Sequence, residues 1–134
     1  MHSSIGHLQF NIAAENMAFY KDLLTFLGWQ IIYDDPAMLG AADASGISVW
    51  FGGFAKAVQN DYDGPGMNHI AFRVETLPAV DATVQRLHAN HMSPLFETPR
   101  HRPEFSASAD ETYYQVMFET PDRILIEVVY QGLK

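Results

Sequence analysis

The chain contains the stretch Met67-Asn68-His69-Ile70-Ala71-Phe72-Arg73-Val74, and its alternating pattern determines how the rest of the sequence is interpreted. Successive residues of a β-strand point to opposite faces, so Ile70, Phe72 and Val74 share one apolar face. His69 begins the opposite, more polar face. The stretch therefore predicts a half-buried strand with a histidine at its start.

The beginning of the chain repeats this pattern in Ile5-Gly6-His7-Leu8-Gln9-Phe10-Asn11-Ile12. His7 again starts the polar face, while the apolar residues alternate with it. His7 and His69 are 62 residues apart, and the same offset relates the apolar residues of the two strands. Two strands that begin with a histidine in the same phase predict a duplicated unit with a site between its halves.

The elements after these two strands follow the same order, which is helix, strand, strand, strand. In the first half the expected elements are a strand over 4–12, a helix over 15–27 and strands over 30–34, 37–43 and 47–52. In the second half they are a strand over 67–75, a helix from 77, a strand over 93–97, a polar loop over 98–111 and strands over 112–119 and 123–130. This βαβββ order, found twice, predicts an α+β fold built from module one (1–53), a linker (54–66) and module two (67–134). Two such modules can bury their sheets by forming a cup-shaped, partly open β-barrel with the helices outside, as one domain over 1–134.

The composition restricts the partners of the protein. The net charge is −8, and the eight Lys and Arg residues form no long basic run, so neither nucleic acid nor an anionic membrane is an expected partner. The 134 residues contain no cysteine, which excludes disulfides and thiolate chemistry and suits a cytoplasmic protein. No apolar run is long enough to span a membrane, and no secretion signal is evident.

Glu127 stands out in the last strand, whose stretch Ile124-Leu125-Ile126-Glu127-Val128-Val129-Tyr130 is otherwise apolar on both faces. An unpaired buried carboxylate costs several kcal/mol, so a partner or a cation is expected beside it. An arginine such as Arg73 or Arg123 is one candidate partner. The corresponding position in the first half is Trp50, which indicates that the fold itself does not require a carboxylate here.

Two imidazoles and one carboxylate form a known ligand set for a divalent metal with open coordination positions. His7, His69 and Glu127 provide this set, and it suits non-haem Fe(II) or catalytic zinc. Open positions allow the oxygens of a substrate to bind the metal. The other interpretation is structural, because a single histidine in a strand is commonly a hydrogen-bonded residue of the core or rim.

The end of the chain also carries a family resemblance. In one superfamily of proteins, the final hairpin commonly shows the motif Phe-x-Asp-Pro-Asp-Gly-x-x-x-Glu. At the corresponding place this chain has Phe118-Glu119-Thr120-Pro121-Asp122-Arg123-Ile124-Leu125-Ile126-Glu127. Together with the duplicated βαβββ order and the two histidines, the chain resembles the vicinal oxygen chelate superfamily. That superfamily includes glyoxalase I, bleomycin-resistance proteins, fosfomycin-resistance enzymes and extradiol dioxygenases. Thr120 and Arg123 depart from the usual Asp and Gly of the turn.

The resemblance implies that His7, His69 and Glu127 bind a divalent metal such as Fe, Zn, Mn or Ni, in a site formed within one chain or across a dimer. Glyoxalase I has a fourth ligand, a glutamate, at the position of Trp50, so its usual activity is not expected. Three ligands are more similar to the extradiol dioxygenase or fosfomycin-resistance arrangement.

Other residues are candidates for contact with a substrate. Glu127 and Tyr114 are the expected catalytic residues; of Tyr113 and Tyr114 only one can face inward, and Tyr114 is preferred as the proton or hydrogen-bond donor. The expected substrate contacts are Trp50, Gln9, Arg73 and His101, with Trp50 stacking on a planar ligand. Core packing of Trp50, salt bridges of Arg73 and a solvated loop around His101 are the structural alternatives.

These observations predict a metal-dependent enzyme for a small oxygen-rich substrate, either a lyase, a dioxygenase or a transferase. The alternative is a metal-free drug-binding protein of the bleomycin-resistance type, with Trp50 in an aromatic-lined cleft. A degenerate module that serves only structure or dimerisation is a third possibility. A homodimer is expected because paired modules leave exposed sheet edges.

Overall fold

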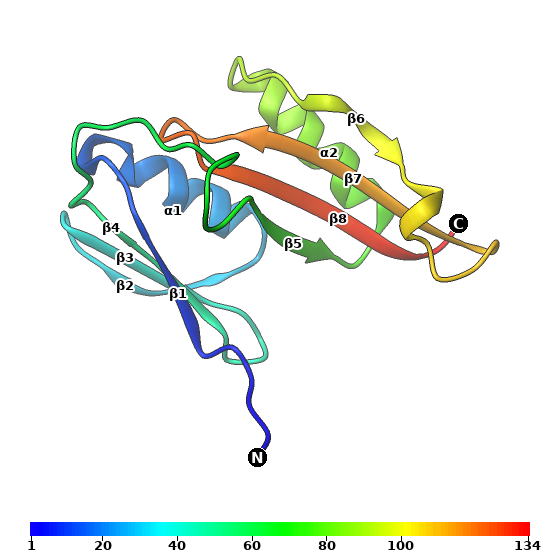
Figure 1. The fold of residues 1–134 in the computed structure, drawn as a ribbon, viewed down its shortest axis with the longest axis horizontal. Coiled ribbons are helices and arrows are strands. Elements are labelled where there is room, and N and C mark those ends of the chain that lie inside the picture. Colours follow the sequence, from blue (N-terminus) through cyan, green and yellow to red (C-terminus); the bar gives the residue numbers. More distant parts are fainter. The chain divides into compact units, whose positions relative to one another are not determined.

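The computed structural model describes residues 1–134, which form two compact units, residues 1–59 and residues 60–134. Each unit contains one four-stranded mixed sheet and one α-helix (Figure 1). The α+β class and the two tandem βαβββ modules are thus confirmed. The closing of the two sheets into a cup, within one domain, stays a prediction.

The first unit follows the predicted order closely. Its elements are β1 (His7–Asn11), the 3₁₀ turn η1 (Ala14–Asn16), α1 (Met17–Phe26), β2 (Gln30–Asp34), β3 (Met38–Ala42) and β4 (Ser48–Gly52). The sheet order is β1-β4-β3-β2, with β1 parallel to β4 and the other neighbours antiparallel. Gly28, just beyond α1, has φ +86°, a left-handed conformation that ends the helix at little cost for glycine.

The second unit repeats this topology with one longer hairpin. Its elements are β5 (Ile70–Val74), α2 (Leu77–Ala89), β6 (Leu95–His101), the 3₁₀ turn η2 (Pro103–Phe105), β7 (Glu111–Glu119) and β8 (Leu125–Leu133), in the sheet order β5-β8-β7-β6. Two expectations are corrected. β6 runs on through His101, where a polar loop over 98–111 was expected, because its backbone pairs with β7. β5 begins at Ile70, so His69 lies immediately before the strand.

The strand register supports the internal repeat. In the first unit Gln9 of β1 lies opposite Trp50 of β4. In the second unit Ala71 of β5 lies opposite Glu127 of β8. Gln9 and Ala71 are separated by the same 62 residues as the two histidines, so Trp50 and Glu127 occupy equivalent positions in the two sheets.

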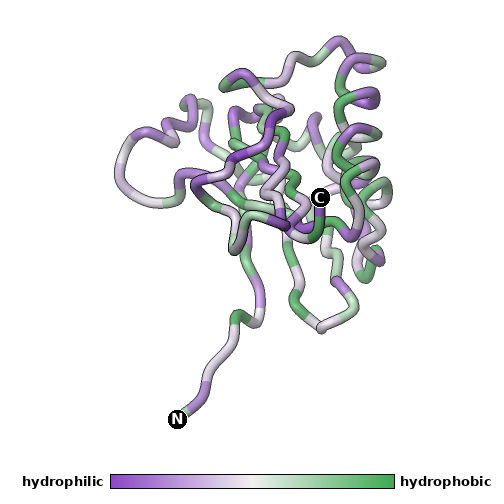
Figure 2. The backbone as a smooth tube through the Cα atoms, turned by 90° about the vertical axis from the view of Figure 1, so that its right-hand side faces the viewer, coloured by the Kyte–Doolittle hydropathy of each residue, from purple (hydrophilic) through white to green (hydrophobic).

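In each unit the helix covers one face of the sheet. Phe51 of β4 stacks on Tyr20 of α1 with ring centroids 4.4 Å apart, and α2 packs against β7 and β8 with Val80 and Leu87 buried. The helical coils in Figure 2 alternate between hydrophobic and hydrophilic colours, as expected for helices with one buried side. Because neighbouring residues of a strand face opposite ways, Trp50 and Glu127 lie on the sheet faces turned away from the helices. Neither helix combines the length and the apolar character needed to cross a membrane.

Candidate functional site

Glu127 is the one charged residue that is buried in the second unit, and only 2% of its surface is exposed. Tyr113 donates its hydroxyl to Oε1 of Glu127 at 2.5 Å, and Gln115 donates Nε2 to the same oxygen at 2.7 Å. The other oxygen, Oε2, lies 3.0 Å from Nε2 of His69. The buried carboxylate therefore has the partners that its burial requires, and they are His69, Tyr113 and Gln115 rather than an arginine.

The orientation of His69 follows from its neighbours. Asn68 donates Nδ2 to the backbone carbonyl of Tyr62 at 3.0 Å, so its Oδ1 is the atom that faces His69. This oxygen can only accept, and Nδ1 of His69 lies 2.8 Å from it, so Nδ1 carries a proton. Nε2 is then the ring nitrogen that faces Glu127.

The 3.0 Å approach of Nε2 of His69 to Oε2 of Glu127 fits a hydrogen bond between the two side chains, and it also fits two ligands that share a cation. Ligand atoms about 2.1 Å from one metal ion and at right angles to each other lie about 3.0 Å apart, which matches the observed separation. A hydrogen bond from Nδ1–H to an amide oxygen is also the usual support for a metal-binding histidine. His69 and Glu127 therefore fit a divalent metal as two of its ligands.

The third expected ligand, His7, lies in the first unit at the start of β1, where it is exposed and opposite Ser48. No group of three or more His, Asp and Glu side chains with metal-binding geometry occurs in the structure. The completion of the site by His7 stays a prediction.

The tyrosine beside Glu127 is Tyr113, so the preference for Tyr114 is corrected. Tyr114 points to the opposite face of β7 and donates to Oδ1 of Asp81, on α2, at 2.7 Å. Burial, followed by the hydrogen bond to Glu127, raises the pKa of Tyr113 well above its usual value of 10.0. At neutral pH Tyr113 therefore keeps its proton and acts as a hydrogen-bond donor.

Sequence reasoning missed Gln115 and Asn68, although one signal was present for the first. The final hairpin pairs Met117 with Glu127, so residues 113, 115 and 117 share the face of the carboxylate. This alternation identifies Tyr113 and Gln115 together and excludes Tyr114. Asn68 gives no comparable signal, because its role depends on the carbonyl of Tyr62 in a loop.

Arg102 lies one side chain away from the carboxylate. Its Nη1 donates to Oε1 of Gln115 at 3.0 Å, while its Nε donates to Glu104 at 2.5 Å. Its guanidinium also stacks on Phe105, with Cζ 4.7 Å from the ring centroid. Gln115 thus separates the positive charge from Glu127, which leaves the carboxylate free of a direct ion pair with arginine.

On the other side of Glu127 the same sheet face is apolar. Tyr62, Met117 and Leu125 form a buried cluster, against which Leu95 packs. Tyr62 donates its hydroxyl to Glu119 at 2.5 Å, and Glu119 in turn is 3.7 Å from Nε of Arg123. Glu127 therefore lies between an apolar area and an arginine-containing area.

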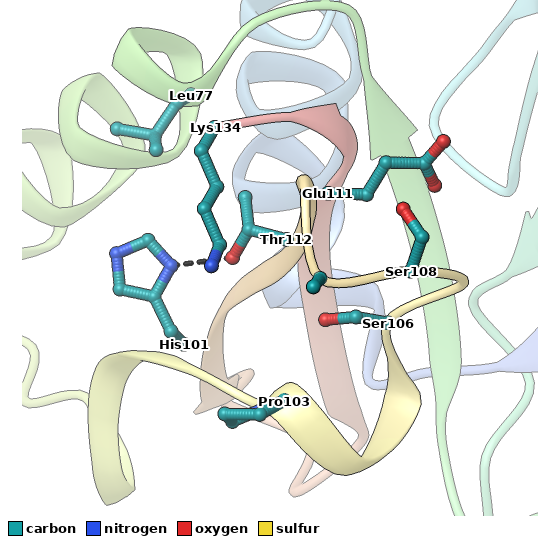
Figure 3. A pocket seen from close by; sticks show the side chains of 9 residues that line it. Leu77, His101, Pro103, Ser106, Ser108, Glu111, Thr112 and Lys134 are labelled. Carbon is teal, nitrogen blue, oxygen red and sulfur yellow. Dashed lines mark hydrogen bonds between the residues drawn. The ribbon is translucent and has the colours of Figure 1, made fainter.

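His101 is not part of the sheet face that carries Glu127. Nδ1 of His101 is 2.5 Å from the hydroxyl of Thr112, and its ring lies 4.6 Å from that of Tyr114 on the α2 side of the sheet. There it lines a cavity of about 570 Å³ with Leu77, Thr112 and Lys134 (Figure 3). His101 thus lies on the opposite sheet face from Glu127, and its contact with a substrate stays a prediction.

The remaining expected substrate contacts lie on the sheet faces away from the helices. Trp50 is half-buried, donates Nε1 to the hydroxyl of Ser48 at 3.0 Å and lies over Gly40. Gln9 is exposed beside it on β1. Arg73 of β5 is exposed in the second unit and lies close enough to lower the pKa of Tyr113 through its charge. Contact of these three residues with a substrate stays a prediction.

The turn before β8 shows how the chain departs from the usual family motif. The hydroxyl of Thr120 accepts hydrogen bonds from the backbone N–H groups of Asp122 and Ile124, at 3.2 and 3.1 Å, which is the role an aspartate plays in such turns. Arg123 has φ +57°, a left-handed conformation that favours glycine. The two unusual residues are therefore compatible with a tight turn before the strand that carries Glu127.

The comparisons with known proteins agree with this geometry. The family model of the Glyoxalase/Bleomycin resistance protein/Dioxygenase superfamily matches residues 4–128, and the chain belongs to this superfamily. A search of curated proteins found no match.

Solved structures with the same fold share little sequence with this chain. A glyoxalase/dioxygenase from Nostoc punctiforme has a TM-score of 0.74 at 16% identity, covering 96% of this chain and 91% of its own. The fosfomycin resistance protein FosX from Listeria monocytogenes, solved with Mn(II) and a sulfate ion, has a TM-score of 0.67 at 19% identity, covering 100% of this chain and 93% of its own. At such identities the likeness concerns the fold alone.

Proposed function

We propose that this protein is a metal-dependent enzyme of the glyoxalase and dioxygenase type that acts on a small, oxygen-rich substrate. The observation that carries the proposal is the 3.0 Å approach of Nε2 of His69 to Oε2 of Glu127, with Nδ1 of His69 held by Asn68. Such an arrangement supplies two fixed ligand atoms for a divalent metal. FosX, which shares the fold, was solved with Mn(II), and this supports the same class of metal here.

When bound, a divalent metal supplies a Lewis acid toward the oxygens of a substrate. The side chains of the chain then have separate tasks. Glu127 and His69 hold the ion, while Gln115 and Asn68 fix the orientation of these two ligands. Tyr113 keeps its proton at neutral pH and donates it in a hydrogen bond to Oε1 of Glu127, which holds the carboxylate in place. Whether the reaction is that of a lyase, a dioxygenase or a transferase depends on the substrate.

We include His7 as the third ligand, since it is equivalent to His69 in the repeat and lies exposed at the start of β1. The site forms within one chain or across a homodimer, and the edge strands of the two sheets offer surfaces for pairing in a homodimer. The absence of cysteine supports a cytoplasmic location.

Elemental analysis of protein purified without an affinity tag tests the metal site. About one divalent ion per chain is expected in the wild type and in the control variant His88→Ala, whose histidine is exposed on α2. His69→Ala and Glu127→Gln should lose the ion. A wild type that binds no added Mn(II), Fe(II), Zn(II) or Ni(II), or a Glu127→Gln variant that keeps the ion, contradicts the proposal.

Mixing two variants that bind metal poorly distinguishes a site formed within one chain from a site formed across a homodimer. His7→Ala and His69→Ala should each bind metal poorly, and in a dimer with shared sites their mixture should regain part of the metal binding. Light scattering should then give twice the chain mass of 15.1 kDa. A monomeric mass contradicts the homodimer. Unchanged metal binding in His7→Ala contradicts His7 as the third ligand but leaves His69 and Glu127 as ligands.

A second candidate function is metal-free binding of planar molecules, as in drug-binding relatives. The observation that favours it is Trp50, which occupies in the first unit the position of Glu127 in the second and is partly exposed. In a Trp29→Phe variant, Trp50 is the only tryptophan, and quenching of its fluorescence by planar ligands without metal would support this function. Quenching that requires an added divalent metal would favour the enzyme.

A further inference from the structure

The sheet face around Glu127 gathers an unusual share of the positive charge of an acidic protein. Of its eight Lys and Arg residues, three lie on this face, namely Arg73, Arg100 and Arg102. Arg73 lies opposite Val129, and Arg100 lies opposite Gln115, whose side chain binds Glu127. Register partners share a face of the sheet, so these arginines surround the carboxylate on one side.

Arg100 and Arg102 each contact a carboxylate, but many of the N–H donors of these arginines remain unused. Arg102 has five N–H donors, of which Nε binds Glu104 and one at Nη1 binds Gln115. Arg100 is 3.6 Å from Glu97, which is almost fully exposed, so this pair is weak. The side chains of Arg100 and Arg102 are 41% and 22% exposed, so their other N–H donors can meet an acceptor from outside the chain.

Arg102 is also held rigidly for a role in binding. Phe105 stacks on its guanidinium, Glu104 fixes Nε, and Gln115 connects it to Glu127. An arginine fixed in this way loses little side-chain entropy when it binds an anion. A divalent metal on Glu127 would add positive charge to the same face and strengthen the attraction.

Resting on the function proposed above, we propose that the substrate carries an oxyanion group, a carboxylate or a tetrahedral phosphorus or sulfur oxyanion, which Arg102 and Arg100 bind beside the metal. The arginines then act as specificity-determining residues, and a metal held by Glu127 and His69 would supply a Lewis acid beside them.

Equilibrium dialysis with inorganic phosphate and, separately, with benzoate tests this inference and distinguishes a tetrahedral from a planar anion. In Mn(II)-treated protein, at least one of the two should bind, and Arg102→Gln should weaken it by about ten- to a hundred-fold, the effect of losing a charge-assisted hydrogen bond. Arg86→Gln, which removes the same charge from α2, is the matched control and should bind as the wild type does. Arg102→Lys should restore binding only in part, because lysine lacks the planar fork.

Broadening of the phosphate ³¹P resonance by Mn(II) reports whether the anion lies near the metal. Failure of both anions to bind, or equal affinities in Arg102→Gln and wild type, overturns the inference. The same dialysis on metal-free protein keeps the two proposals apart. A protein that binds no Mn(II) but binds an anion through Arg102 refutes the metal site and retains the anion site. A protein that binds Mn(II) but neither anion retains the metal site and refutes the anion site.

Discussion

Removal of the Tyr113 hydroxyl should destabilise the second unit. In Tyr113→Phe the ring keeps its edge contact with Phe105, at 5.4 Å between centroids, so the change is confined to the hydrogen bond to Oε1 of Glu127. A hydrogen bond to a charged group contributes about 1.5–3 kcal/mol, and Glu127 is buried. The free energy of unfolding of metal-free protein at pH 7 should therefore fall by about this amount.

Urea denaturation followed by circular dichroism gives this free energy, and amide hydrogen exchange in β7 and β8 assigns the loss to the second unit. A double-mutant cycle isolates the contribution of the charge. In a Glu127→Gln background the acceptor is neutral, so Tyr113→Phe should cost about 0.5–1.5 kcal/mol.

Tyr33→Phe is the matched control, because Tyr33 also donates to a carboxylate, that of Asp35 at 2.6 Å, but on the exposed surface. Its removal should not measurably change the stability. A Tyr113→Phe variant as stable as the wild type, or an equal cost of Tyr113→Phe in both Glu127 backgrounds, would refute the idea that a buried, charged acceptor holds this hydroxyl.

Three further predictions concern pH, the final turn and Trp50. Folding raises the pKa of Tyr113, and that of Tyr114 to about 12, so it favours the protonated forms of both side chains. These two groups should leave the stability unchanged below pH 10 and should lower it as the pH rises above 10. Over the same range, the urea midpoint of a Tyr113→Phe/Tyr114→Phe variant should fall less than that of the wild type. Thr120→Val removes the acceptor of two backbone N–H groups and should cost about 1–3 kcal/mol in urea unfolding, whereas Thr120→Asp should retain the stability; equal losses in both variants would contradict this role. Gly40→Ala places a Cβ 2.6 Å from the Trp50 ring and should cost about 1–3 kcal/mol with a shift of tryptophan emission, while Gly6→Ala, with open space around it, should change neither; an unchanged emission in Gly40→Ala would show that Trp50 does not lie on Gly40.

The elements of the fold could be predicted because their signals are local. Alternation identified β2 at its observed bounds, and Gly28 marked the end of the first helix, since only a glycine adopts its left-handed conformation at little cost. The 62-residue repeat was equally accessible, because duplicated strands keep the phase of their side chains. The extent of β6 was not, because Phe96 and Glu97 adopt left-handed conformations within it, a bulge that no alternation indicates.

The candidate site was predictable only in part. Glu127 was identified because a carboxylate in an apolar strand requires a partner, and His69 because it matches His7. The choice between Tyr113 and Tyr114 required the register of the final hairpin, which places Tyr113 beside Glu127 and Tyr114 beside Asp81 of α2. The position of His101 was not predictable for a related reason, since the face on which it lies depends on the bulge in β6.

The sequence by itself therefore determined the duplicated βαβββ order and the presence of a carboxylate that must be paired, because periodicity and burial costs act along single strands. Only the tertiary structure decided which side chains meet that carboxylate. The 3.0 Å approach of His69, its orientation by Asn68 and the link from Gln115 to Arg102 join residues from a loop and several strands. Such contacts depend on register and side-chain direction between elements, which no local pattern of residues contains.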